Sequence, residues 1–114
     1  MLYSDQEDIQ GLCPPGWHVP GENDWTLIFN YFAGNAYAGD ALKTGGPSGF
    51  NALLAGGYFK NRAWVFENLS GFFWSSTAQG SMKAWAHGLN ANNHGVSFYP
   101  SSRANAYSVR CLKD

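Results

Sequence analysis

Two cysteines near opposite ends of the chain set the strongest constraint on its fold. Cys13 and Cys111 are the only cysteines among 114 residues. A disulfide between them would close a loop of ~100 residues, which stabilises the folded state by about 4.7 kcal/mol in the loop-entropy estimate. The alternative is a pair of reduced, buried thiols in a cytosolic protein. We expect the disulfide, which would hold both ends of the chain together in an oxidising compartment.

The residue composition predicts a compact, loop-rich fold held together by large rings. A length of 114 residues fits one domain. Aromatic residues make up 17% of the chain and there are 14 glycines, whereas charged residues make up only 13%. A helical bundle would instead be rich in Leu, Ala, Glu and Lys.

The charge is small overall but unevenly distributed. A net charge of -1 provides no general attraction to nucleic acid or to an anionic membrane. Residues 1–67 carry seven acids and three bases, whereas residues 68–114 carry one acid and four bases. No carboxylate side chain lies between Glu67 and Asp114, which limits the chemistry open to this late segment.

No stretch of the sequence has the character of a membrane span or a secretory signal peptide. Apolar runs fall well short of the roughly 18 residues that a span requires. The first residues, MLYSD, become polar almost at once. We therefore expect no membrane insertion, and either another export route or a chain that is part of a longer protein.

The first half of the sequence predicts two helices. Prolines at positions 14, 15 and 20 exclude a helix from the entry segment. Trp25, Ile28, Phe29 and Phe32 then recur at three- and four-residue spacing, which is one face of a helix that starts at Glu22. A second, short helix is expected over residues 38–43, where the Gly-Gly-Pro run that follows ends it.

The rest of the sequence predicts short strands separated by turns. Runs of about five residues at roughly ten-residue spacing are typical of β structure. Two helices followed by such strands predict the α+β class. The expected strands cover residues 50–59, 64–66, 71–77, 84–89, 96–99 and 107–111.

Several motifs occur in the order found in a known bacterial domain. They are CPPGWHVP at 13–20 followed by Trp25, GDALK at 39–43, SGFNAL at 48–53, GGY at 56–58, FWSST at 73–77, AW at 84–85 and SVRC at 108–111. Over about residues 12–113, the chain resembles the major paralogous domain of Fibrobacter succinogenes. It departs from the pattern at Gly21, where the family often has Ser or Thr, and at Ala106, where it often has Gly.

This resemblance implies a fold and the kinds of protein in which such a domain occurs. It implies a C-type-lectin-like fold of the α+β class, with two helices packed on a small antiparallel sheet with long loops, as one domain over residues 1–114. Similar domains occur on exported and surface proteins of bacteria. They also serve as variable proteins of diversity-generating retroelements, including phage-borne ones.

The same resemblance implies a binding module rather than an enzyme. Its setting would be extracellular, on a cell surface or on a virion, and its partner an unknown protein or glycan on a cell or host. It is compatible with a homo-oligomer. It implies no cofactor and no nucleic acid.

Site chemistries that need acids, metals or nucleophiles fit this sequence poorly. Calcium needs about six to eight oxygen ligands with several carboxylates, and residues 68–113 contain none. His18, His87 and His94 are too few and too scattered for a zinc signature. We assign a structural hydrogen bond to His18 and places on the binding surface to the other two. Glu22 and Asp24 are expected to be solvated surface acids rather than a glycosidase pair.

The late segment, residues 77–107, is expected to form the binding surface. Its apolar members Trp85, Leu89, Val96 and Phe98 alternate with polar or small residues. If Trp85 and Leu89 face the core, the residues between and beside them face outward. The outward set is rich in Asn, Ser, Tyr, His and Gly, as antibody paratopes are, although an ordinary polar loop surface has the same composition. The expected ligand contacts are Gln79, Met82, Lys83, Ala86, His87, Gly88, Asn90, Asn92, Asn93, His94, Ser97, Tyr99, Ser101, Arg103 and Asn105.

The alternative function is a fixed-ligand accessory domain of the cell envelope, either carbohydrate-binding or structural. Trp64 lies in a segment flanked by Gly and Asn, where it would provide a stacking platform for a sugar. Otherwise it belongs to the core, as we expect for Trp17, Trp25, Trp74 and Trp85. The sequence does not name the ligand under either hypothesis.

Overall fold

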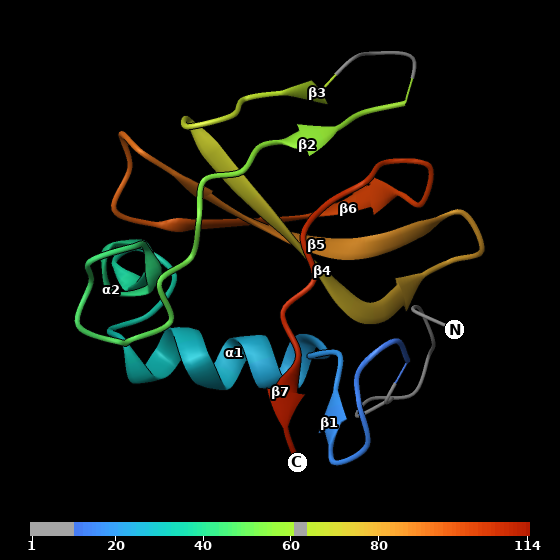
Figure 1. Cartoon of the computed structure of the whole chain (residues 1–114), viewed down its shortest axis with the longest axis horizontal. Helices are drawn as coiled ribbons and strands as arrows, with labels where there is room; N and C mark the ends of the chain where they lie inside the picture. The colour runs from blue at the N-terminus through green and yellow to red at the C-terminus, as the bar shows by residue number, and fades with distance from the viewer. Residues whose placement is uncertain (1–10, 61–63) are drawn as a thin grey trace.

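Two helices precede the main sheet, as the sequence predicts (Figure 1). In the computed structural model, which describes residues 11–60 and 64–114, α1 spans Glu22–Tyr31 and α2 spans Ala38–Leu42. The Asp24 carboxylate accepts a hydrogen bond from the Gly21 backbone N–H at 3.1 Å, which satisfies a free donor at the start of α1. The buried face of α1 contains Trp25 and Phe29, which belong to the apolar spacing in the sequence.

The main sheet consists of three antiparallel strands. β4 spans Ser70–Gln79, β5 spans Lys83–Asn90 and β6 spans Val96–Ser102, in the order β4-β5-β6. The register of β4 on β5 shifts between Trp74 and Ala78, which marks a β-bulge. In this sheet β5 is therefore the central strand and β6 an edge strand.

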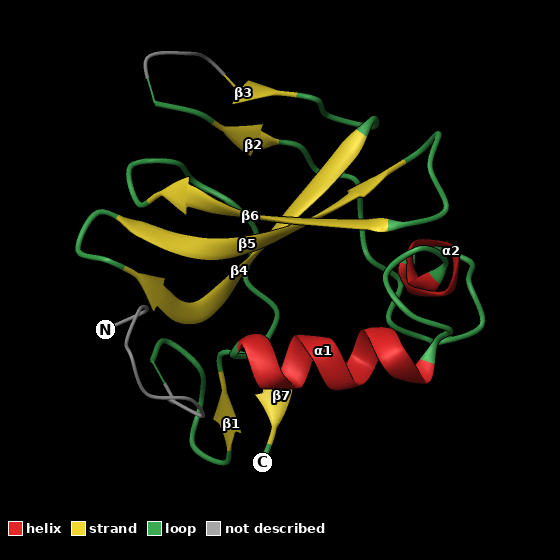
Figure 2. Ribbon diagram, turned by 180° about the vertical axis from the view of Figure 1, so that it is seen from behind, coloured by secondary structure: helices red, strands yellow, loops and turns green. Residues whose placement is uncertain are grey.

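Two small sheets lie on opposite sides of the main sheet (Figure 2). β1 (Trp17–His18) pairs with β7 (Leu112–Lys113) near α1, and β2 (Gly57–Tyr58) pairs with β3 (Trp64–Val65) on the other side. The β1–β7 pair brings both ends of the described chain together, next to a disulfide between Cys13 and Cys111. The expected disulfide is thus confirmed.

The core occupies both faces of the main sheet. On the helix side, Trp25 and Phe29 of α1 pack with Phe73 of β4. On the far side, Phe72 and Trp74 of β4 pack with Ala84, Ala86 and Tyr107. Consecutive β4 side chains point to opposite faces, so the run of three aromatics supplies both clusters. The α+β class is confirmed, and the C-type-lectin-like architecture stays a prediction from the resemblance.

One expected strand is shorter than the sequence predicts, and another does not form. Residues 50–59 contain only β2 as a strand, and the remainder is loop with isolated bridges at Ala52 and Gly56. Residues 107–111 do not form a strand. Ser108 makes one isolated bridge to Phe73, and the chain then leaves the sheet to reach the disulfide.

Candidate functional site

The expected ligand contacts lie at two ends of the main sheet rather than in one patch. Lys83 and Asn90 are the first and last residues of β5, and an extended strand of this length spans roughly 23 Å. One group gathers around the β4–β5 turn and the other around the β5–β6 turn beside α2. The first group is Gln79, Met82, Lys83 and Arg103, and the second is Asn90, Asn92, Asn93 and His94.

The β5–β6 turn is anchored to α2 by two charged side chains. Lys43 Nζ donates hydrogen bonds to the carbonyl oxygens of Asn90 and Asn93, at 2.9 and 2.8 Å. His94 Nδ1 donates to Asp40 Oδ2 at 2.5 Å. This bond from His94 holds the pKa of the Asp40 carboxyl below its usual range. The turn is therefore a braced loop that presents exposed polar side chains.

Four expected contacts are buried: Ala86, His87, Gly88 and Ser101. Their expected place on the binding surface is wrong. Ala86, His87 and Gly88 belong to the central strand β5, and a core cluster covers each of its faces. The His87 ring lies against Trp25 and Phe29, with centroids 5.2 and 5.0 Å away. Ser101 of β6 is the cross-strand partner of the buried Ala84 and lies beside Tyr107. A ligand on the surface therefore does not reach these four residues.

Two further expected contacts are engaged in bonds within the chain. Arg103 donates from Nε to the Lys83 carbonyl oxygen at 3.0 Å and from Nη2 to the Gly80 carbonyl oxygen at 2.8 Å. Asn105 Oδ1 accepts a hydrogen bond from the Lys60 backbone N–H at 2.9 Å. Arg103 thus holds the β4–β5 turn, and Asn105 ties its own loop to the segment that follows β2.

The remaining expected contacts differ in exposure. Gln79, Met82 and Ser97 are exposed, with Met82 at 76%. Tyr99 is half-buried, and burial raises the pKa of its hydroxyl. Met82 in the β4–β5 turn and Tyr99 in the edge strand β6 therefore present apolar surface on ordered parts of the chain.

An exposed aromatic shelf runs along β5 and β6 on the helix side of the sheet. We define this shelf as Lys83, Trp85, Phe98 and Pro100, which are exposed or half-buried. Trp85 and Pro100 are cross-strand partners, and the ring centroids of Trp85 and Phe98 lie 6.3 Å apart. Phe98 is 54% exposed, because α1 packs over β4 and over His87 of β5 and leaves this part of the edge strand uncovered.

The two rings of the shelf, Trp85 and Phe98, belong to the apolar set that the sequence pattern assigned to the core, whereas Lys83 was an expected ligand contact. Leu89 and Val96 are buried as expected, but Trp85 is only half-buried and Phe98 is exposed. Trp85, Leu89, Val96 and Phe98 share one face of the sheet, and the alternating pattern does not show how much of that face the helix covers. Only the position of β6 at the edge of the sheet would have indicated that Phe98 is exposed.

A second exposed aromatic pair lies on the β2–β3 hairpin. Tyr58 and Trp64 are cross-strand partners and are 45% and 49% exposed. Trp64 Nε1 donates a hydrogen bond to the Ala55 carbonyl oxygen at 2.8 Å, which fixes the indole. Trp64 therefore belongs to the surface, whereas Trp25 and Trp74 are core residues as expected. The expected place of Trp17 in the core is wrong, because it is 39% exposed in the two-residue strand β1.

Comparison with protein families matches residues 1–113 to the Fibrobacter succinogenes major domain. The chain belongs to this family. No curated protein and no solved structure matches it. The family assignment therefore rests on the sequence match, and the expected resemblance is confirmed.

In this member of the Fibrobacter succinogenes major domain family, the CPPGWHVP motif at residues 13–20 has a structural role. His18 lies within hydrogen-bond distance of two carboxylates, with Nε2 3.0 Å from Asp24 Oδ2 and Nδ1 2.7 Å from Asp114 Oδ1. The expected structural role of His18 is confirmed, because its ring ties β1 to α1 and to the C-terminal residue. The expectation that Glu22 and Asp24 are solvated surface acids is wrong, because both are partly buried and bonded to His87 and His18.

The disulfide between Cys13 and Cys111 also indicates the cellular compartment of the protein. A disulfide that joins the two ends fits an extracytoplasmic, oxidising environment. Neither helix of the described residues is long and apolar enough to cross a membrane. Within residues 11–60 and 64–114, no group of three or more His, Cys, Asp or Glu side chains is placed to hold a metal ion.

Proposed function

We propose that this chain is a binding module that recognises a surface protein of another cell or of a host through the aromatic shelf. The observation that carries the proposal is the exposure of Phe98, on the edge strand β6, beside Trp85 of the neighbouring strand β5. Aromatic side chains on a rigid scaffold contribute large contact area at little entropic cost, and they are enriched among the residues that dominate binding energy. The proposal assigns no catalytic residue and no cofactor.

The charge of the neighbouring residues supports a protein partner. Lys83 lies at one end of the shelf, and the Glu22 carboxylate, which reaches the cross-strand partner of Phe98, is engaged in its bond to His87. An apolar centre with a basic edge matches a partner surface that has an apolar patch with an acidic rim.

Binding of the labelled domain to intact bacterial and host cells tests this proposal. Replacing Phe98 by Ser removes the central ring, and we expect apparent affinity to fall at least about tenfold. The control is Leu27→Ser, which removes an even more exposed apolar side chain from α1 (70% against 54% for Phe98). Equal binding by wild type and Phe98→Ser would remove the shelf from the function.

We also propose that the chain is a variable protein, in which exposed positions of the β5–β6 turn and of β6 change between copies of the gene. The support comes from the exposed polar residues Asn92, Asn93, His94 and Ser97, which lie at the surface on a braced scaffold. Such positions tolerate substitution at little cost in stability.

Deep sequencing of the last third of the gene in the source population tests this role. Variation should concentrate at those exposed positions, whereas the buried Ala86 and His87 should stay constant. If the exposed positions are as constant as the core, the variable-protein role is wrong and a single dedicated ligand should be sought.

The β2–β3 hairpin supports a second candidate, a carbohydrate-binding accessory function. Tyr58 and Trp64 present two half-exposed rings, and the indole of Trp64 is held by its bond to Ala55. Fixed, exposed aromatic faces suit the apolar faces of sugar rings.

A carbohydrate array tests this candidate: Trp64→Ala should abolish sugar binding and Trp64→Phe should retain part of it. Unchanged sugar affinity in Trp64→Ala would exclude the platform.

A further inference from the structure

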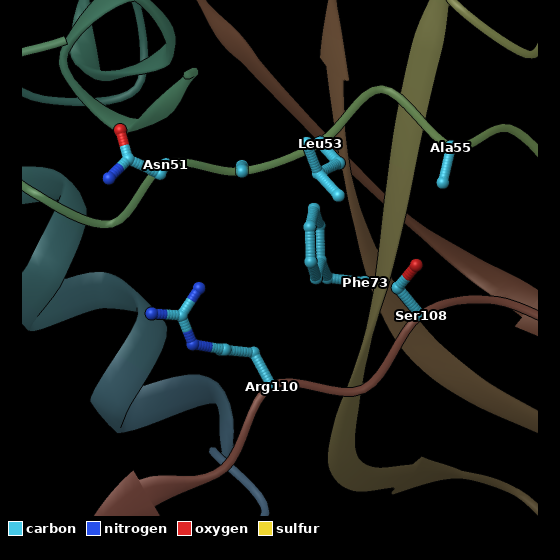
Figure 3. Close-up of a pocket in the computed structure, with 7 residues that line it drawn as sticks. Asn51, Leu53, Ala55, Phe73, Ser108 and Arg110 are labelled. Atoms are coloured by element: carbon cyan, nitrogen blue, oxygen red, sulfur yellow. The ribbon is translucent and has the colours of Figure 1, made fainter. Parts of the chain in front are cut away.

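Arg110 lies where three shallow hollows meet, away from the shelf. The first hollow, of about 190 Å³, is lined by residues that include Asn51, Leu53, Phe73 and Ser108 (Figure 3). The other two measure about 250 and 310 Å³. Arg110 lines all three hollows, so its guanidinium is the group that they share.

The two larger hollows adjoin between α1 and the C-terminal segment, and we call them together the groove. Both are lined by Ile28, Phe50, Arg110 and Leu112. Trp17 and Lys113 add to the wall at one end, and Phe32 and Leu42 at the other. The groove is therefore apolar along its length with a cation at its centre.

The guanidinium of Arg110 is held in place by the chain itself. Its Nη1 donates a hydrogen bond to the Phe50 carbonyl oxygen at 2.8 Å, and its central carbon lies 4.3 Å from the centroid of the Phe50 ring. No other bond of Arg110 to the described residues is present. The Nε and Nη2 donors of an exposed, fixed guanidinium are thus free to bind a ligand, and a preorganised group loses little entropy on binding.

The described residues around the groove give it a positive charge. Among residues 11–60 and 64–114, no Asp or Glu lines any of the three hollows, whereas Arg110 lines all of them and Lys113 lines one. The C-terminal neighbour, Asp114, is engaged with His18 at 2.7 Å. A planar guanidinium with two free donors is the side chain that best matches a carboxylate.

We propose that this groove binds an extended peptide that carries one carboxylate between apolar side chains. The carboxylate would accept hydrogen bonds from the free donors of Arg110, and one apolar side chain would enter each of the two larger hollows. The walls of Ile28, Phe32, Leu42 and Leu112 favour aliphatic side chains over the hydroxyl groups of an acidic sugar.

The spacing of such a peptide follows from strand geometry. Side chains of an extended chain alternate in direction, so residues two positions apart point to the same side, about 6.6 Å from one another. The acid should therefore be flanked by apolar residues two positions away on each side. This inference does not depend on the shelf, because the groove and the shelf have no residue in common.

Titration of the intact protein with a capped peptide, Ac-Leu-Gly-Glu-Gly-Leu-NH2, tests the inference. We expect saturable shifts of backbone amide signals around Phe50 and Leu112 at up to about 10 mM peptide, and binding at least about tenfold weaker in Arg110→Gln. The charge-matched control is Lys60→Gln, which removes a cation that lines none of the three hollows. This control should bind as wild type does.

A second comparison avoids the risk that Arg110→Gln alters the fold. The neutral peptide Ac-Leu-Gly-Gln-Gly-Leu-NH2 on the wild-type protein should bind about tenfold more weakly than the acidic one. Equal binding of the two peptides, or no saturable binding of the acidic peptide, would overturn the inference. Stronger binding of trigalacturonate than of the acidic peptide would overturn it as well, because the groove would then be a site for acidic sugars.

Discussion

His87 Nε2 lies 2.6 Å from Glu22 Oε2, so a carboxylate in the first turn of α1 bonds to a buried imidazole in the central strand. Only 5% of the His87 surface is exposed. Its Nδ1 atom is buried without a hydrogen-bond partner among the described residues. The bond to Glu22 is thus the polar contact that connects this ring to the helix.

Removing the Glu22 carboxylate should destabilise the fold. In Glu22→Ala both nitrogens of the buried ring lack a protein partner, which costs about 1–3 kcal/mol. Glu22→Gln, which keeps a hydrogen-bond acceptor, should lose less. Denaturant unfolding monitored by tryptophan fluorescence measures the difference. Asn23→Ala, at the exposed neighbouring position, is the control, and a Glu22→Ala variant as stable as this control would contradict the role of the bond.

The burial of His87 shows where strand patterns in the sequence fail. Period-two alternation says which residues share a face but not whether that face is covered. The helix of residues 22–31 could be predicted, because its apolar stripe is visible in the sequence. That this helix covers His87 but leaves Phe98 open depends on how α1 crosses the sheet, which no local pattern contains.

The disulfide should contribute a large share of the stability. Cys13 and Cys111 are 98 positions apart, and a cross-link over a loop of about 100 residues contributes about 4.7 kcal/mol in the entropy model. Native domains are stable by only about 5–15 kcal/mol. The double variant Cys13→Ala/Cys111→Ala should therefore unfold at a much lower temperature than wild type. Thermal unfolding with and without dithiothreitol checks this, since reduced wild type should match the variant. A loss below about 1 kcal/mol would contradict it.

The disulfide could be predicted from the sequence, whereas the groove around Arg110 could not. Two cysteines near opposite ends leave one pairing within the chain. The groove forms because residues 107–111 leave the sheet instead of continuing as a strand, so that Arg110 reaches Phe50. This path depends on contacts between segments 60 residues apart in sequence, which periodicity does not describe.

Close packing of α2 on the β5–β6 turn predicts different effects for two buried glycines. A Cβ atom at Gly39 would lie 2.5 Å from the Gly95 carbonyl oxygen and 2.7 Å from that of His94. Because both contacts are with backbone, Gly39→Ala should cost about 1–3 kcal/mol or more. At Gly88, a Cβ atom would come no closer than 3.5 Å to its nearest neighbour, the Tyr99 hydroxyl, so Gly88→Ala is the matched control. Equal stability of the two variants in denaturant unfolding would show that the turn moves away from α2.

The hydrogen bond between His94 and Asp40 predicts a pH dependence of stability in acid. The bond lowers the pKa of Asp40 in the folded state relative to the unfolded state. Such a group stabilises the fold above its unfolded pKa, and this contribution is lost as the pH falls through the lower folded pKa. His94→Ala should therefore raise the pKa of Asp40, and Lys43, which lies 3.3 Å from the carboxylate, should keep part of the effect.

NMR titration of the Asp40 carboxyl carbon measures this pKa directly in wild type and in His94→Ala. Unfolding at several values below about pH 5 should show that the variant loses less stability on acidification than wild type does. Asn92→Ala, which alters an exposed residue of the same turn, should leave the Asp40 titration unchanged. An unchanged pKa of Asp40 in His94→Ala would mean that Lys43 alone holds the carboxylate, and that the turn is tied to α2 through the lysine rather than through His94.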